Sequence, residues 1–103
     1  TITVMCIIED LGFCKKGDGG AFVSEKGRLH FDGRLKPVMN TDGGGLSSNH
    51  PGMRGIFLLL EATRQLRGES TSQAKNPKLA VAVGNGGQLG ARHSTGVTII
   101  AAD

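Results

Sequence analysis

The chain is poor in the aromatic residues that mark many binding proteins. It has no Trp or Tyr and only four Phe. Proteins that bind single-stranded nucleic acids stack the bases on aromatic side chains beside a basic groove. Here the net charge is +3, but the basic residues are scattered along the sequence. Nucleic-acid binding is therefore unsupported, whereas a small anionic ligand such as a coenzyme needs only one or two Lys or Arg.

Cysteine is scarce, and no long apolar run is present. The two cysteines, Cys6 and Cys14, form no C-x-x-C pair, so we expect both to be reduced and structural, in a cytoplasmic protein. The apolar run at residues 56–60 is far shorter than the roughly 20 residues that cross a bilayer. We therefore expect no membrane span.

Histidine is equally sparse, with three residues that are widely separated in the sequence. No spacing among His30, His50 and His93 resembles a zinc motif, so we expect no metal site. His30 lies in a polar stretch and is expected at the surface.

Glycine, by contrast, is abundant. The 103 residues include 17 Gly, against a usual share of about 7%. They cluster at residues 17–20, 43–45 and 84–90, which predicts three tight turns. The length suits one domain, residues 1–103. Because the sequence begins inside an apolar pattern, we expect that domain to be a piece of a longer chain.

Hydrophobic periodicity predicts an α/β fold. Apolar residues at i, i+3, i+4 and i+7 predict a helix over residues 2–12, ended by Gly12. Residues 21–23 suit either a short strand or a single helical turn. A second helix is predicted over 51–67, with strands over residues 36–40, 79–83 and 95–100. The last two strands are too far apart for a tight hairpin.

The first half of the second predicted helix has no polar side. Residues 56–60 are apolar all round, and such a helix must be buried on every side. A chain of 103 residues offers few layers to surround it. This is a second reason to expect a larger protein.

His50 ends a glycine-rich segment, residues 40–52, just before this helix. Histidine titrates near neutral pH and is a frequent general base. From the residues alone, a capping histidine or one satisfied in the core is the favoured interpretation. A triad of Ser47, His50 and Asp42 lacks any nucleophile-elbow sequence. Arg54 is read as a solvated helix residue, with a phosphate or partner contact as the minor alternative.

Several motifs together resemble the C-terminal part of thiolases, in particular the sterol-carrier-protein-type and lipid-transfer subgroup. In that pattern a strand ends in Asn-x-x-Gly-Gly, a His-Pro pair follows, and the central helix begins. The matching positions here are Asn40, Gly43, Gly44, His50 and Pro51. Residues 11–20 match a second stretch, Leu-Gly-Phe-Cys-x-Lys-Gly-x-Gly-Gly, and residues 79–100 match the final strand, turn and strand.

The resemblance implies the C-terminal half of a five-layer αβαβα fold, with a mixed sheet and a buried central helix. It implies an acyltransferase that makes or breaks carbon–carbon bonds next to acyl-CoA thioesters. His50 would be the base that activates a cysteine of the missing N-terminal half, and substrate would contact Asn40, Gly43, Gly44, Gly86 and Gly87. Coenzyme A enters as part of the substrate, no other cofactor is implied, and a homo-oligomer is expected.

One position departs from the family pattern. When Gly86 and Gly87 are aligned on the last Gly-Gly turn, Val83 falls where the family places a second acid/base residue. Valine cannot transfer a proton. Either another group such as His93 takes the role, or the reaction is a retro-aldol cleavage or another acyl transfer, or the protein is a non-catalytic acyl-CoA or lipid binder.

Overall fold

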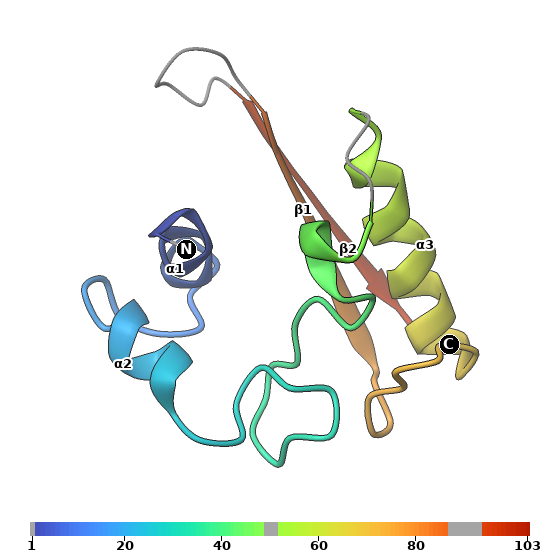
Figure 1. Cartoon of the computed structure of the whole chain (residues 1–103), viewed down its shortest axis with the longest axis horizontal. Coiled ribbons are helices and arrows are strands. Elements are labelled where there is room, and N and C mark those ends of the chain that lie inside the picture. The colour runs from blue at the N-terminus through green and yellow to red at the C-terminus, as the bar shows by residue number, and fades with distance from the viewer. Residues whose placement is uncertain (1, 49–51, 87–93) are drawn as a thin grey trace. The chain divides into compact units, whose positions relative to one another are not determined.

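The computed structural model describes residues 2–48, 52–86 and 94–103, which form two compact units (Figure 1). The first unit, Thr1–Met39, contains helices α1 (Ile2–Asp10) and α2 (Gly19–Ser24). The second unit, Asn40–Asp103, contains the 3-10 turn η1 (Gly44–Leu46), helix α3 (Arg54–Arg67) and strands β1 (Leu79–Gly86) and β2 (Ser94–Ala101). Helices and strands in this order confirm the α/β class.

In the first unit, α1 packs on α2. The predicted helix is confirmed, and Ile8 is its buried residue, at 3% exposure. The carboxylate of Glu9 accepts a hydrogen bond of 2.9 Å from the backbone N–H of Gly19, at the start of α2. A carboxylate is favourable at a helix N-terminus, where the backbone N–H groups have no partner within the helix. Residues 21–23 lie within α2, so the helical turn, and not the short strand, is the correct alternative.

The strand predicted over residues 36–40 is wrong. Val38 forms only an isolated parallel bridge with Leu29, through a hydrogen bond of 2.8 Å from Met39 N–H to the Leu29 carbonyl. The extended conformation cannot continue past Asn40, whose φ of 48° lies in the left-handed region. The apolar run in residues 36–40 was too short to show that no strand would form there.

In the second unit, α3 ends where the sequence predicts. Gly68 follows it with φ of 74°, and its N–H bonds back to the carbonyls of Arg64 and Gln65. A left-handed glycine after the last turn is a common helix stop. Arg64 and Arg67 in that turn also suit the negative end of the helix dipole.

β1 and β2 pair antiparallel in continuous register, from Leu79 opposite Ala101 to Gly86 opposite Ser94. The two strands are therefore direct neighbours, joined by a connection longer than a tight hairpin, as predicted. Both strands are longer than expected, because Gly84 and Gly86 belong to β1 and not to the turn. No other strand pairs with them in the part of the chain that the structure describes.

Helix α3 packs against this hairpin, mainly on β1 (Figure 1). Ala82 of β1 and Ala62 of α3 are both 8% exposed. The helix is not enclosed, however, since Ile56 is 50% and Leu60 53% exposed. Among the described residues, neither the mixed sheet nor the buried central helix of the prediction is present.

Candidate functional site

The predicted substrate-binding residues Asn40, Gly43 and Gly44 lie together in one turn. The N–H of Gly43 donates a hydrogen bond of 2.8 Å to the carbonyl of Asn40. Gly43 and Gly44 have φ of 87° and 71°, a conformation that side chains disfavour. A Cβ on Gly43 would lie 2.2 Å from Ser47 Oγ, so this position needs glycine for space as well.

Two serines that follow this turn donate hydrogen bonds to its backbone carbonyls. Ser47 Oγ donates to the carbonyls of Asp42 and Gly44, at 2.7 and 3.2 Å. Ser48 Oγ also reaches the Gly44 carbonyl, at 3.4 Å. These bonds add to the backbone bond of 3.3 Å that the Gly44 carbonyl accepts from the N–H of Ser47, and they give the Asp42 carbonyl a partner.

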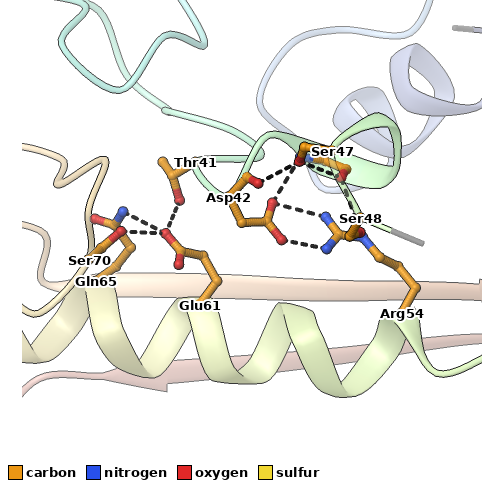
Figure 2. A network of polar contacts seen from close by, with 9 residues as sticks. Thr41, Asp42, Ser47, Ser48, Arg54, Glu61, Gln65 and Ser70 are labelled. Carbon is orange, nitrogen blue, oxygen red and sulfur yellow. Dashed lines mark hydrogen bonds and ion pairs between the residues drawn. The ribbon is translucent and has the colours of Figure 1, made fainter. Parts of the chain in front are cut away.

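The same turn is joined to the start of α3 by an ion pair between Asp42 and Arg54 (Figure 2). Both guanidinium NH groups take part: Nη2 lies 2.9 Å from Oδ1, and Nη1 contacts Oδ2. Asp42 Oδ1 also accepts a bond of 3.0 Å from the N–H of Gly44. The hydrogen bonds from Arg54 lower the pKa of Asp42, burial opposes this, and the Gly44 N–H adds to the lowering. Asp42 is therefore ionised throughout the neutral range.

A second polar cluster surrounds Glu61, two turns further along α3 (Figure 2). One carboxylate oxygen, Oε1, accepts hydrogen bonds from Thr41 Oγ1, Gln65 Nε2 and Ser70 Oγ. Burial raises the pKa of Glu61, but these three bonds together outweigh burial and lower it. The cluster ties the turn at residues 40–48 to α3 at a second point.

Gln65 extends this cluster to the segment that follows α3. Its amide nitrogen also donates 2.9 Å to the carbonyl of Ser72, and its Oε1 accepts 2.9 Å from the N–H of Ala74. Gln65 is 6% exposed and Ala74 2%. Both ends of the buried amide are thus paired, as buried polar groups require.

The remaining predicted site residues fall elsewhere. Gly86 lies at the end of β1, opposite Ser94, on a different element from the Asn40 turn. His50, Gly87 and the alternative base His93 lie outside the described residues. Val83 lies within β1, opposite Val97, so its neighbour across the hairpin offers no proton donor either.

Comparison with known proteins identifies the family. A family model described as "Thiolase C-terminal domain-like" matches residues 1–100. The chain belongs to the thiolase C-terminal domain-like family. The match spans nearly the whole chain and confirms the resemblance drawn from the Asn40, Gly43, Gly44, His50 and Pro51 pattern. No solved structure matches this chain.

Three enzymes are similar to this thiolase-family chain. It is 37% identical over 100 residues to an acetyl-CoA acetyltransferase of Methanothermobacter thermautotrophicus. The aligned residues make up 95% of this chain and 23% of the acetyltransferase. It is 44% identical over 66 residues to the 17-hydroxy-3-oxo-4-pregnene-20-carboxyl-CoA lyase of Mycobacterium tuberculosis, covering 63% of this chain and 16% of the lyase. It is 40% identical over 74 residues to a steroid side-chain-cleaving aldolase of Thermomonospora curvata, covering 71% of this chain and 17% of the aldolase.

Within this thiolase-family domain, Asp42 and Ser47, two members of the imagined triad with His50, are engaged in other contacts. The carboxylate of Asp42 is occupied by Arg54 and by a backbone N–H, and Ser47 Oγ donates to carbonyl oxygens. Arg54 itself is neither solvated nor free, because its side chain is 14% exposed and paired.

Sequence reasoning missed the roles of Asp42, Arg54, Glu61 and Gln65. Their partners lie up to 20 positions away, beyond the reach of local patterns. The one available signal was Arg54 itself, a cation at a helix start, where the dipole disfavours it.

Three further findings concern the described part of the chain. Nowhere in residues 2–48, 52–86 and 94–103 do three His, Cys, Asp or Glu side chains gather closely enough to hold a metal ion. Over the same ranges, every helix is too short or too polar to cross a membrane. Cys6 and Cys14 are both free thiols, and Cys6 is exposed.

Proposed function

We propose that this chain is the base-bearing C-terminal part of a thiolase-like enzyme that acts on acyl-CoA thioesters. The observation that carries the proposal is the family match over residues 1–100, which includes His50. The chain spans about a quarter or less of the relatives' length, so the nucleophilic cysteine belongs to an N-terminal half. We further propose a cytoplasmic homo-oligomer with no cofactor beyond the coenzyme A of its substrate.

In this proposal His50 accepts the proton of that cysteine thiol. The thiolate is the reactive form, and a neighbouring imidazole lowers the cost of forming it. In the cleavage direction the thiolate attacks the ketone of a 3-ketoacyl-CoA, and the carbon–carbon bond breaks. The acyl group stays on sulfur until free CoA takes it, while acetyl-CoA leaves after gaining a proton. The Asn40 turn supports this role, since its two left-handed glycines let a substrate approach the backbone.

The test is His50→Ala in the complete protein. Loss of a general base should lower kcat by roughly 10²- to 10⁴-fold, with an unchanged circular dichroism spectrum. His30→Ala is the matched control, because His30 is an exposed histidine with no assigned role. Unchanged turnover in His50→Ala would remove the proposal.

A retro-aldol lyase is the second candidate. It is favoured by the names of two relatives, a lyase and an aldolase, and by Val83, which cannot serve as the second acid/base group. In this reaction a base removes the proton of a β-hydroxyl, the carbon–carbon bond breaks, and the thioester enolate takes up a proton. No nucleophilic cysteine is needed.

Substrate pairs separate the candidates. A thiolase consumes free CoA with a 3-ketoacyl-CoA, whereas a lyase splits a 3-hydroxyacyl-CoA into a carbonyl compound and a shorter acyl-CoA without added CoA. Binding of both thioesters with no product from either would indicate the non-catalytic binder.

A further inference from the structure

Two separate contacts join the turn at residues 40–48 to helix α3 (Figure 2). One is the ion pair between Asp42 and Arg54. In the other, Thr41 Oγ1 donates a hydrogen bond of 2.5 Å to Glu61 Oε1. Thr41 and Asp42 are neighbours in the sequence and directly precede the two left-handed glycines of the turn. The turn is therefore attached right beside the glycines that the family pattern matches to substrate.

The two contacts lie on one side of α3, about two helical turns apart. Arg54 and Glu61 are seven positions apart in the helix. At 3.6 residues per turn this spacing returns to nearly the same face, about 10 Å further along the axis. A turn held at one point could still pivot about that point. Because this turn is held at two points along the axis, its orientation is fixed as well as its place.

Both contacts have fixed partners on the helix. In the ion pair, two guanidinium nitrogens of Arg54 meet two carboxylate oxygens of Asp42, and the side chains are 14% and 21% exposed. A forked, partly buried pair of this kind fixes direction as well as distance. In the second contact, Gln65 and Ser70 donate to the same oxygen of Glu61 that the turn reaches. The acceptor is therefore held in place independently of the turn.

The attachments are passed on to the backbone of the turn. Asp42 Oδ1 accepts a bond of 3.0 Å from the N–H of Gly44. The N–H of Gly43 donates to the carbonyl of Asn40, and the Asn40 side chain lies beside Gly44, where a Cβ would be 3.4 Å from Nδ2. Displacement of Asp42 would therefore shift both glycines and the Asn40 amide together.

We propose that these two contacts position the substrate-binding turn: they hold Asn40, Gly43 and Gly44 in the arrangement that receives the thioester of an acyl-CoA. The inference rests on the proposed function, but it needs only binding of the acyl-CoA and not its turnover. Either contact alone keeps the turn on α3, and loss of both releases it. The affinity for acyl-CoA then falls in proportion to the fraction of molecules that still hold the binding arrangement.

The experiment measures the dissociation constant, Kd, of a dethia analogue of acetyl-CoA by titration calorimetry on the complete protein. In this analogue a methylene replaces the thioester sulfur, so the carbonyl is kept and the acyl group cannot be transferred. Thr41→Val and Arg54→Met each remove one contact and should raise Kd by no more than about threefold. The double variant should raise Kd by about tenfold or more, beyond the product of the two single effects.

Thr63→Val is the matched control. Thr63 Oγ1 donates a bond of 2.9 Å to the carbonyl of Leu59 within α3, so this variant loses a hydroxyl on the same helix without touching the turn. Its Kd should equal that of wild type. If the two contacts were merely structural, the double variant would melt at a lower temperature, yet its Kd, measured well below that temperature, would not change.

A Kd of the double variant within about twofold of wild type would overturn the inference, as would equal weakening in Thr63→Val. If the double variant fails to fold, Thr41→Val combined with Arg54→Lys takes its place, since lysine keeps the charge and removes the fork. A Kd no higher than that of Thr41→Val alone would then overturn the inference. If the wild-type protein does not bind the analogue, the proposed function fails as well. If wild type and double variant bind it equally, only the inference fails.

Discussion

Glu61 accepts three side-chain hydrogen bonds at one carboxylate oxygen, from Thr41, Gln65 and Ser70. These donors favour the ionised form, and they outweigh burial in lowering the pKa of Glu61. A group whose pKa is lower in the folded state stabilises the protein above its unfolded pKa. That stability is lost as the pH falls through the folded value.

Glu61→Gln should reduce the free energy of unfolding at pH 7 by about 1.5–3 kcal/mol, the usual range for bonds to a charged group. The difference from wild type should shrink as the pH falls below about 4.3, the ordinary pKa of glutamate, because the unfolded chain gains its proton there before the folded carboxylate does. Urea unfolding of the complete protein at pH 7 and at about pH 3.5 measures this. Glu69→Gln, at an exposed position, should change stability little at either pH. A pH-independent loss in Glu61→Gln would contradict the assignment.

The glycines of the Asn40 turn differ in what they tolerate. Gly43 has φ of 87° and no room for a Cβ beside Ser47, whereas Gly45 has neither restriction.

Gly43→Ala should therefore destabilise the protein by at least about 1–2 kcal/mol, the cost of a left-handed alanine before any clash is added. Gly45→Ala, two positions away, should be neutral or slightly stabilising. Thermal unfolding of the two variants side by side is the measurement. Equal melting temperatures would show that the turn does not require a left-handed glycine.

At the scale of elements, α3 was the easiest part to predict. Its apolar pattern marks it in the sequence, and its end at Arg67 is confirmed, but the helix begins at Arg54 and not at residue 51 as predicted. The strand over residues 36–40 failed because strand formation depends on a partner, and only a bridge from Leu29 is present. The ends of β1 and β2 were also missed, since pairing carries the ladder through Gly84 and Gly86. Local composition alone marks those glycines as a turn.

Two glycines test how α3 is terminated. Gly68→Ala should cost about 1–2 kcal/mol, because its φ of 74° is unfavourable to alanine. Gly55 lies in the first turn of the same helix with open space around it. Gly55→Ala should therefore stabilise the protein by up to about 1 kcal/mol. Denaturant midpoints of the complete protein measure both. Changes of the same sign would contradict the αL cap as the helix stop.

At the scale of the whole molecule, the chain leaves large apolar side chains exposed on both units. Ile56 and Leu60 lie one turn apart on α3, and Val97 and Ile99 lie on β2, all at 50–67% exposure. Contiguous exposed apolar surface usually marks an interface. The family match, together with the small share of each relative that is covered, suggests that other parts of a thiolase-like protein cover it.

The chain expressed by itself should therefore bind a hydrophobic dye such as anilinonaphthalene sulfonate. Ile56→Ser together with Leu60→Ser should lower the dye fluorescence without loss of helix content. Arg67→Ser, an exposed polar change on the same helix, should leave it unchanged. The complete protein should bind less dye per molecule than the isolated chain. Equal dye binding by the complete protein and the isolated chain would mean that Ile56 and Leu60 stay exposed in the complete protein.

The family and the fold class could be predicted from the sequence, because both rest on local motifs and periodicity. The polar contacts of the candidate site could not. Asp42 meets Arg54 across twelve positions, and Thr41 meets Glu61 across twenty. Such pairs depend on how the turn returns to the helix, which no local pattern encodes. His50, the centre of the prediction, lies outside the described residues, so its role stays a prediction.

The buried amide of Gln65 should slow the local opening of the segment that follows α3. Ala74 lies in an irregular segment, where amide protons ordinarily exchange quickly with solvent, yet its N–H donates to Gln65 Oε1 and the residue is 2% exposed. That proton can leave only when the segment separates from α3. In hydrogen–deuterium exchange, Ala74 should therefore be protected to the same degree as the middle of α3, and Gln65→Ala should make it exchange as a loop residue does.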